Sequence, residues 1–481
     1  MIANLDKNRE MSKLLSNKNR VNTDLISHFG RFGLQQTLRR LGMEKQQGVS
    51  ALQLIISLCF FRINGESIYS MYRKDLHSLL ETGKNFYYSM LNRESMDWRT
   101  LLMRMSVRFL AIQRKEGAEE SGQPLCYIVD DTTLEKTGVS MEGVSRVFDH
   151  VKHKCVVGYK LLLLAFFDGR STILVDFSLH REKGEWNNYG LSEEERRGQY
   201  GKKRDFSNSN QQRAKGMDAK KIDNALEMMR RAWKSGFHTT YALCDSWFTY
   251  EKFIHGVRSI GDGSLHFLGM GKMVNRKSYV RGFYHNVYQM ISYYERTEAK
   301  RDWVYNYTYF RVNGRMGEPV RIFFIRDGSN KNWNIIITTD FRMDIKKCFE
   351  IYQKRWNVEI LKILKKESKG YLGLGKYQGR DLDGQIADCI FCYMTYMVMA
   401  LDKRLNDYET FGEMFREQRD ALMSLMLWKR VLDIIRRIMK TLADLIGISP
   451  EELLDNIIGY EKTPWKYMDM IDALELVEDA A

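Results

Sequence analysis

Four polar residues recur at helical spacing late in the chain: Tyr352, Arg355, Glu359 and Lys366. At about 100° per residue they fall within an arc of roughly 60°, so a helix would present all four on one face. An ordinary solvated helix face carries opposite charges that pair at i,i+4. This face surrounds a single carboxylate with basic residues and a tyrosine. It is therefore either a solvated face with ion pairs or an acid held among phosphate-binding groups.

Other acids stand at the ends of two expected strands. Asp130 and Asp131 close the apolar run L-C-Y-I-V-D-D (125–131), and Asp245 closes Y-A-L-C-D (241–245). Strand ends are rigid, so side chains from two strands can converge at one edge of a sheet. Gathered carboxylates are costly without a cation, and hard divalent cations prefer oxygen ligands. Acids from two strands and the helix are therefore expected to hold two metal ions, which drive phosphodiester displacement without a protein nucleophile.

Other kinds of site are less well supported by the sequence. The nine histidines form no cluster apart from His150 and His153, and we find no convincing Ser/His/Asp or Cys/His set. Cys389 and Cys392 form one C-x-x-C, but it lies in an apolar run without a second pair at zinc spacing. Seven scattered cysteines argue against a secreted disulfide framework and favour the reducing cytoplasm.

The charge of the chain favours a polyanionic partner. The formal net charge is +14, which points first to nucleic acid and second to an acidic membrane surface. Two apolar runs, 49–61 and 386–401, are shorter than the ~20 residues needed to span a bilayer. We therefore expect no membrane segment.

The order of expected elements predicts a mixed sheet covered by helices, with all-α regions before and after it. Three meandering strands are followed by α/β crossovers, a β-rich interruption and a long helix. We expect a helical N-terminal DNA-binding domain (1–118) and a catalytic core in two parts (119–270 and 340–400). A β-rich insertion (271–339) lies between those parts, and a helical C-terminal region (401–481) is suited to dimerisation.

The helix spells Y-x2-R-x3-E-x6-K, which resembles the signature of bacterial DDE transposases of the insertion-sequence-four family. V-D-D-T-T (129–133) and C-D-S-W-F (244–248) resemble the strands that carry the two aspartates of this family. The resemblance covers roughly residues 120–400. It implies a ribonuclease H-like α/β core with a β-rich insertion before the helix that carries the glutamate.

The resemblance also implies roles for individual residues. Asp131, Asp245 and Glu359 would ligate two Mg²⁺ ions, for which Mn²⁺ can substitute. Asp131 is preferred to Asp130 because the aspartate of this family commonly precedes threonine. Alternation along a strand puts the two on opposite faces, so only one of them should enter the site. The DNA-binding residues would be Tyr352, Arg355 and Lys366, which would position the phosphates of the transposon end.

The implied activity is cut-and-paste transposition through a hairpin intermediate and strand transfer. The implied partners are double-stranded DNA with terminal inverted repeats, target DNA and a second copy of the chain in a synaptic complex, in the cytoplasm with the bacterial nucleoid. Two alternatives stay open: a ribonuclease H-like nuclease without strand transfer, and a domesticated DNA-binding protein. The presence of Asp131, Asp245 and Glu359 argues against the second alternative.

Two further features have two interpretations each. The segment 182–221 is rich in arginine and lysine and lies between the two aspartates, so it is either a solvated loop or a mobile loop that follows DNA phosphates. Trp303 and Trp333 lie in the expected insertion and either stack on a flipped base or simply pack.

Overall fold

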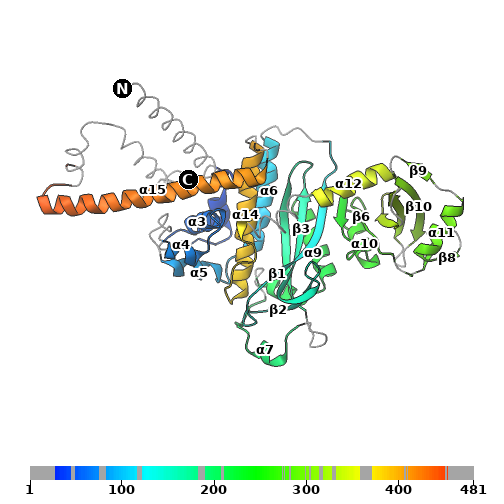
Figure 1. Cartoon of the computed structure of the whole chain (residues 1–481), viewed down its shortest axis with the longest axis horizontal. Coiled ribbons are helices and arrows are strands. Elements are labelled where there is room, and N and C mark those ends of the chain that lie inside the picture. The colour runs from blue at the N-terminus through cyan, green and yellow to red at the C-terminus, as the bar shows by residue number, and fades with distance from the viewer. Residues whose placement is uncertain are drawn as a thin grey trace, which may run out of the picture.

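The protein is an α/β protein built on one twelve-stranded sheet. The computed structural model describes residues 28–44, 49–74, 83–115, 122–182, 190–206, 211–273, 275, 277–280, 283–297, 300–302, 305–313, 318–327, 332–357, 371–405, 408, 410–449 and 452. Figure 1 shows the N-terminal helices at one end, the sheet in the middle and the β-rich insertion at the other end.

The centre of the sheet has the strand order β4-β3-β1-β5-β6. The first three strands pair antiparallel, whereas β1, β5 and β6 pair parallel. Three meandering strands followed by two parallel strands in this order form a ribonuclease H-like sheet, so the predicted fold class is confirmed. The strands are β1 (Cys126–Glu135), β3 (Lys154–Phe167), β4 (Thr172–His180), β5 (Tyr241–Cys244) and β6 (His266–Met270), and a short β2 (Ser145–Asp149) pairs with β3.

The turn between β3 and β4 is stabilised by hydrogen bonds to the Asp168 carboxylate. The Asp168 carboxylate accepts hydrogen bonds from the backbone N–H groups of Arg170 and Ser171 at 2.9 and 2.7 Å. Gly169 has a φ of 98°, a conformation that only glycine adopts readily. The two strands on either side of this turn are buried almost throughout, because helices cover both faces of the sheet.

The β-rich insertion extends the same sheet. Strand β12 pairs antiparallel with β6, and the order continues through β11, β10, β7 and β8, with β9 also on β10. The bounds are β7 (Ser278–Val280), β8 (Phe283–His285), β9 (Lys300–Asp302), β10 (Tyr305–Asn313), β11 (Pro319–Asp327) and β12 (Asn334–Thr338), with α11 (Val287–Thr297) beside them. The predicted β-rich interruption is confirmed, and its continuity with the core sheet is a finding of the structure.

Helices pack on both faces of the sheet. α9 (Lys221–Lys234) contacts β3 and β4, α10 (Glu251–Arg258) contacts β6, and α12 (Ile345–Asn357) contacts β5 and β6. Asp344 caps the start of α12, because its carboxylate accepts the N–H of Lys347 at 2.7 Å. Two short helices, α7 (Glu193–Arg197) and α8 (Gln212–Gly216), lie between β4 and α9 in the sequence.

One long apolar helix, α14 (Leu382–Leu405), joins the N-terminal helices to the sheet. It is long and apolar enough to cross a bilayer, but its apolar stretch is entirely buried inside the protein, which identifies it as a core helix. It contacts β4 and the helices α3 (Ala51–Ile63), α5 (Lys84–Leu91), α6 (Trp98–Lys115) and α15 (Phe411–Ile446), while α2 (Leu34–Arg40) and α4 (Ile68–Arg73) pack on α3. The predicted division at residue 400 falls within α14.

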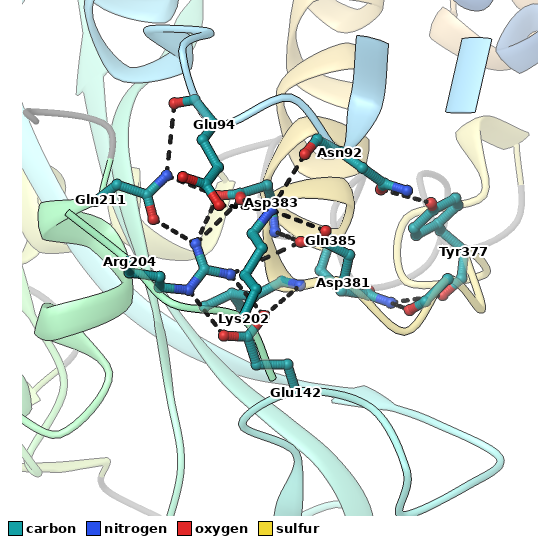
Figure 2. Close-up of polar contacts among 12 residues, drawn as sticks. Asn92, Glu94, Glu142, Lys202, Arg204, Gln211, Tyr377, Asp381, Asp383 and Gln385 are labelled. Atoms are coloured by element: carbon teal, nitrogen blue, oxygen red, sulfur yellow. Dashed lines mark hydrogen bonds and ion pairs between the residues drawn. The ribbon is translucent and has the colours of Figure 1, made fainter. Parts of the chain in front are cut away.

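A buried ion-pair cluster fixes the loop before α8 to the start of α14 (Figure 2). Arg204 donates to Glu142 at 2.8 Å and to Asp383 at 3.0 Å, and its side chain is only 4% exposed. Lys202 donates to Asp381 at 2.9 Å and also pairs with Asp383. The cluster therefore connects three segments that lie far apart in the sequence, and it leaves Lys202 and Arg204 with protein carboxylates as partners.

We predict that Arg204→Met lowers the free energy of unfolding by about 3 kcal/mol, because it removes the cation of Glu142 and one of the two cations that pair with the buried Asp383. Lys203→Met is the matched control, since Lys203 is the exposed residue between the two buried cations. It should change stability by no more than about 0.5 kcal/mol. Denaturant unfolding followed by circular dichroism measures both, and equal midpoints for the two variants would contradict the structural role of the cluster.

Candidate active site

The register of two parallel strands brings two aspartates together. β1 and β5 pair with Ile128 opposite Leu243. Two residues further along each chain, Asp130 stands level with Asp245 where β5 ends. Because side chains at equal positions of neighbouring strands point to the same face, these two carboxylates share one edge of the sheet.

Arg355 of α12 lies between these carboxylates. One guanidinium nitrogen, Nη2, is 3.6 Å from Oδ1 of Asp130 and 3.8 Å from Oδ2 of Asp245. The other oxygen of Asp245 accepts the backbone N–H of Trp247 at 2.9 Å, which fixes the orientation of this carboxylate. The helix predicted to carry the site therefore does reach both strand ends.

The electrostatics of Arg355 depend on these neighbours. Burial opposes its charged form, but Tyr352 and the two carboxylates outweigh this effect and raise its pKa above the ordinary value. Arg355 is therefore a permanent cation beside two acids. Together the two carboxylates and the guanidinium carry one net negative charge.

Tyr352 is part of the core. Its side chain is 1% exposed, and its hydroxyl donates to the backbone carbonyl of Cys244 at 3.2 Å. Burial raises the pKa of this phenol, so it stays protonated and can keep donating. Tyr352 thereby anchors α12 to the end of β5, next to Asp245, and its contact with a DNA phosphate stays a prediction.

Asp131 points to the other face of the sheet, against our preference for it as the site residue. Its carboxylate accepts a hydrogen bond from Nζ of Lys221 at 2.6 Å, and Lys221 also lies 4.1 Å from the centre of the Trp247 ring. Burial alone would raise the pKa of Asp131, but the charge and hydrogen bond of Lys221 outweigh it and hold that pKa below the ordinary value. Asp130, and not Asp131, is the neighbour of Asp245 and Arg355.

Two predicted site residues, Glu359 and Lys366, lie in 358–370, outside the described residues. Glu359 follows the last described residue of α12 by two positions. Within the part of the chain that the structure describes, no three His, Cys, Asp or Glu side chains form a group that could hold a metal ion. The metal-binding roles of Glu359 and of the two aspartates therefore stay predictions.

The basic segment between the aspartates is largely paired with protein acids. Arg213 is buried and bonds to Asp176 at 3.2 Å, and Lys221 bonds to Asp131. Together with the pairing of Lys202 and Arg204, this supports a structural role for these four residues, while 183–189 and 207–210 of the segment lie outside the described residues.

Of the two tryptophans of the insertion, the structure describes Trp333. Trp333 lies 4.6 Å beneath the guanidinium of Arg326 and packs against the core, so ordinary packing accounts for it. Trp303 is outside the described residues.

We predict that Asp131→Asn lowers the free energy of unfolding by about 1.5 kcal/mol at neutral pH, the lower end for hydrogen bonds to charged groups. Because the pKa of Asp131 is lowered in the folded protein, this contribution is complete above the unfolded pKa of about 3.9 and is lost as pH falls through the folded value. The difference between wild type and variant should thus be constant from neutral pH to about pH 5 and shrink below about pH 4.

The matched control is Asp223→Asn, because Asp223 pairs with Lys252 in an exposed ion pair. That change should alter stability by less than about 1 kcal/mol. Urea titrations over this pH range measure both variants. A difference for Asp131→Asn that grows as pH falls would contradict the assigned pairing.

A comparison with known proteins relates this part of the chain to endonucleases. Residues 51–262 match the family described as DDE superfamily endonuclease, a span that includes β1, β5 and both aspartates. A comparison with curated proteins gives no match. In fold and over this span, the chain is similar to the DDE superfamily endonucleases, which supports nuclease or transposase activity in general.

Proposed function

We propose that this protein is a cut-and-paste DNA transposase of the insertion-sequence-four type that uses two-metal-ion chemistry. The observation that carries the proposal is the side-by-side position of Asp130 and Asp245, both within 4 Å of Arg355 from the helix that leads to Glu359. A nuclease active site of this class needs acids from two strands and a helix at one edge of a sheet.

The donor set fits magnesium. Asp130 and Asp245 offer hard carboxylate oxygens, and Glu359 would add a third carboxylate, bringing the net charge around Arg355 to minus two. Such a charge suits divalent cations, with Mn²⁺ able to substitute. Bound magnesium would activate the attacking water or 3′-hydroxyl and stabilise the leaving oxygen.

The residues around the carboxylates would bind and orient the DNA. The guanidinium of Arg355 is suited to a phosphate oxygen next to the acids, and Lys366 would add a point charge further along the same segment. Tyr352 acts through position, because it holds α12 against β5.

The proposed partners follow from the same chemistry. A net charge of +14 supports a DNA polyanion, here the inverted repeats at the two ends of the element and then the target DNA. A homodimer would hold both ends in one synaptic complex. The N-terminal helices are proposed to bind the repeats, and the C-terminal region is proposed to support dimerisation.

Cleavage of DNA that carries the repeats bordering the element tests the active-site assignment. With Mg²⁺ or Mn²⁺ we expect nicking at the repeat, reduced more than about 100-fold by Asp130→Asn, Asp245→Asn or Glu359→Gln, since even changes behind a metal ligand cost 10–100-fold. Asp131→Asn should cleave within several-fold of wild type at temperatures below its melting point.

DNA binding by the same variants, measured by mobility shift, separates a lost active site from a lost fold. Full cleavage by Glu359→Gln, or loss of cleavage in Asp131→Asn but not in Asp130→Asn, would refute the assignment.

The main alternative is a ribonuclease H-like nuclease without strand transfer. Pre-cleaved ends with a free 3′-hydroxyl, incubated with target DNA and Mg²⁺, distinguish the two functions. A transposase joins the end to the target, and the joined product is seen as a longer labelled strand. A plain nuclease gives shortened strands only, and that result would replace the proposed function by the alternative.

A further inference from the structure

A basic pocket lies at the turn between β3 and β4, on the side of the sheet where α12 and α14 pack. Its volume is about 430 Å³, within the range of about 300–1,000 Å³ that is usual for small-molecule sites. It is lined by Phe167, Gly169, Arg170, Ser171, Thr172, Lys354, Tyr396, Ala400, Lys403, Arg404 and Phe411. These residues come from the β3–β4 hairpin, α12, the end of α14 and the start of α15.

The charge of the pocket is one-sided. Four of its lining residues are cationic, Arg170, Lys354, Lys403 and Arg404, and no acid is among the residues that line it. Arg404 is held in place by Asp168 at 2.9 Å and by the Ser171 hydroxyl at 3.2 Å. Four cationic side chains around one pocket suit a group that carries negative charge.

Three aromatic residues also line the pocket. Phe167, Tyr396 and Phe411 are each less than 10% exposed, and the rings of Tyr396 and Phe411 stack with centroids 5.4 Å apart. Lys354 lies 5.9 Å from the centre of the Phe167 ring. A ligand with both a phosphate and a flat apolar part would meet both cationic and aromatic side chains in this pocket.

We propose that this pocket binds one unpaired nucleotide of a DNA strand, a proposal that rests on the proposed function. The phosphate would contact the arginines and lysines, and the base would lie against the aromatic side chains, where stacking of this kind tolerates any base sequence. A pocket of this size admits a single nucleotide but not a duplex.

The position of the pocket relates it to the candidate active site. Lys354, which lines the pocket, directly precedes Arg355, which lies between the two aspartates. Phe167 pairs with Cys126 on β1, and Asp130 is four residues further along that strand, or about 13 Å. A strand held in the pocket would therefore be within a few nucleotides of the carboxylates, given about 3.4 Å per nucleotide of a stacked strand.

Binding of DNA without metal tests this pocket independently of cleavage. The probe is a labelled duplex with or without a 5′-phosphorylated single-stranded overhang, titrated with full-length protein in EDTA at several salt concentrations. In wild type the overhang should tighten binding by about tenfold, as aromatic stacking of one base is worth about 1–3 kcal/mol.

Two variants remove this gain in different ways. Arg170→Ala with Lys403→Ala should abolish the effect of the overhang, and it should make the slope of log K against log salt shallower by about 0.7 for each phosphate that the variant no longer neutralises. Ala400→Phe should abolish the effect by filling the pocket without removing a charge. Arg114→Ala with Lys234→Ala is the control, because it removes one arginine and one lysine at exposed positions outside the pocket.

A gain from the overhang that survives both pocket variants, or is abolished equally in the control, would overturn the proposal. Tight binding of free deoxynucleotide with no preference for the overhang would also overturn it, in favour of a small-molecule site. Because the experiment measures binding and not cleavage, its result can be interpreted even if the protein has no transposase activity.

Discussion

The parallel pairing of β1 with β5 is the constraint on which the site depends. It fixes Asp130 level with Asp245. Asp131 points to the opposite face of the sheet, and rotation of its side chain would not bring its carboxylate beside Asp245. The guanidinium of Arg355 then offsets the repulsion between these two carboxylates. The hydrogen bond from Tyr352 to the Cys244 carbonyl holds α12 in the position that this requires. Strand register, helix position and charge balance thus support one another at a single edge of the sheet.

On the opposite face of β1, acidic side chains pair with cations of the protein. Asp131 has its own cation in Lys221, and Asp176 on the same face is completely buried with Arg213 and Arg231 as partners. Asp131 and Asp176 on this face therefore have protein cations within 3.2 Å. The guanidinium of Arg355 lies 3.6 Å from Asp130 and 3.8 Å from Asp245 on the other face.

Sequence patterns predicted the fold class, the β-rich interruption and the helix face of Tyr352 and Arg355, because each follows from local periodicity. They misassigned Asp131, because alternation says that two neighbours face apart but not which faces the site; only the register with β5 decides this. The buried pairing of Lys202 and Arg204 was also out of reach, because their partners Asp381 and Asp383 are about 180 residues away. Long-range pairing of this kind leaves no local signal.

The central claim is that metal binds between Asp130 and Asp245. Anomalous diffraction from crystals grown with Mn²⁺ tests it most directly, because the ion is located without reference to activity. We predict a peak in direct coordination with both of these carboxylates. A peak beside Asp131 on the α9 face, or ordered crystals with none at the shared edge, would contradict this account.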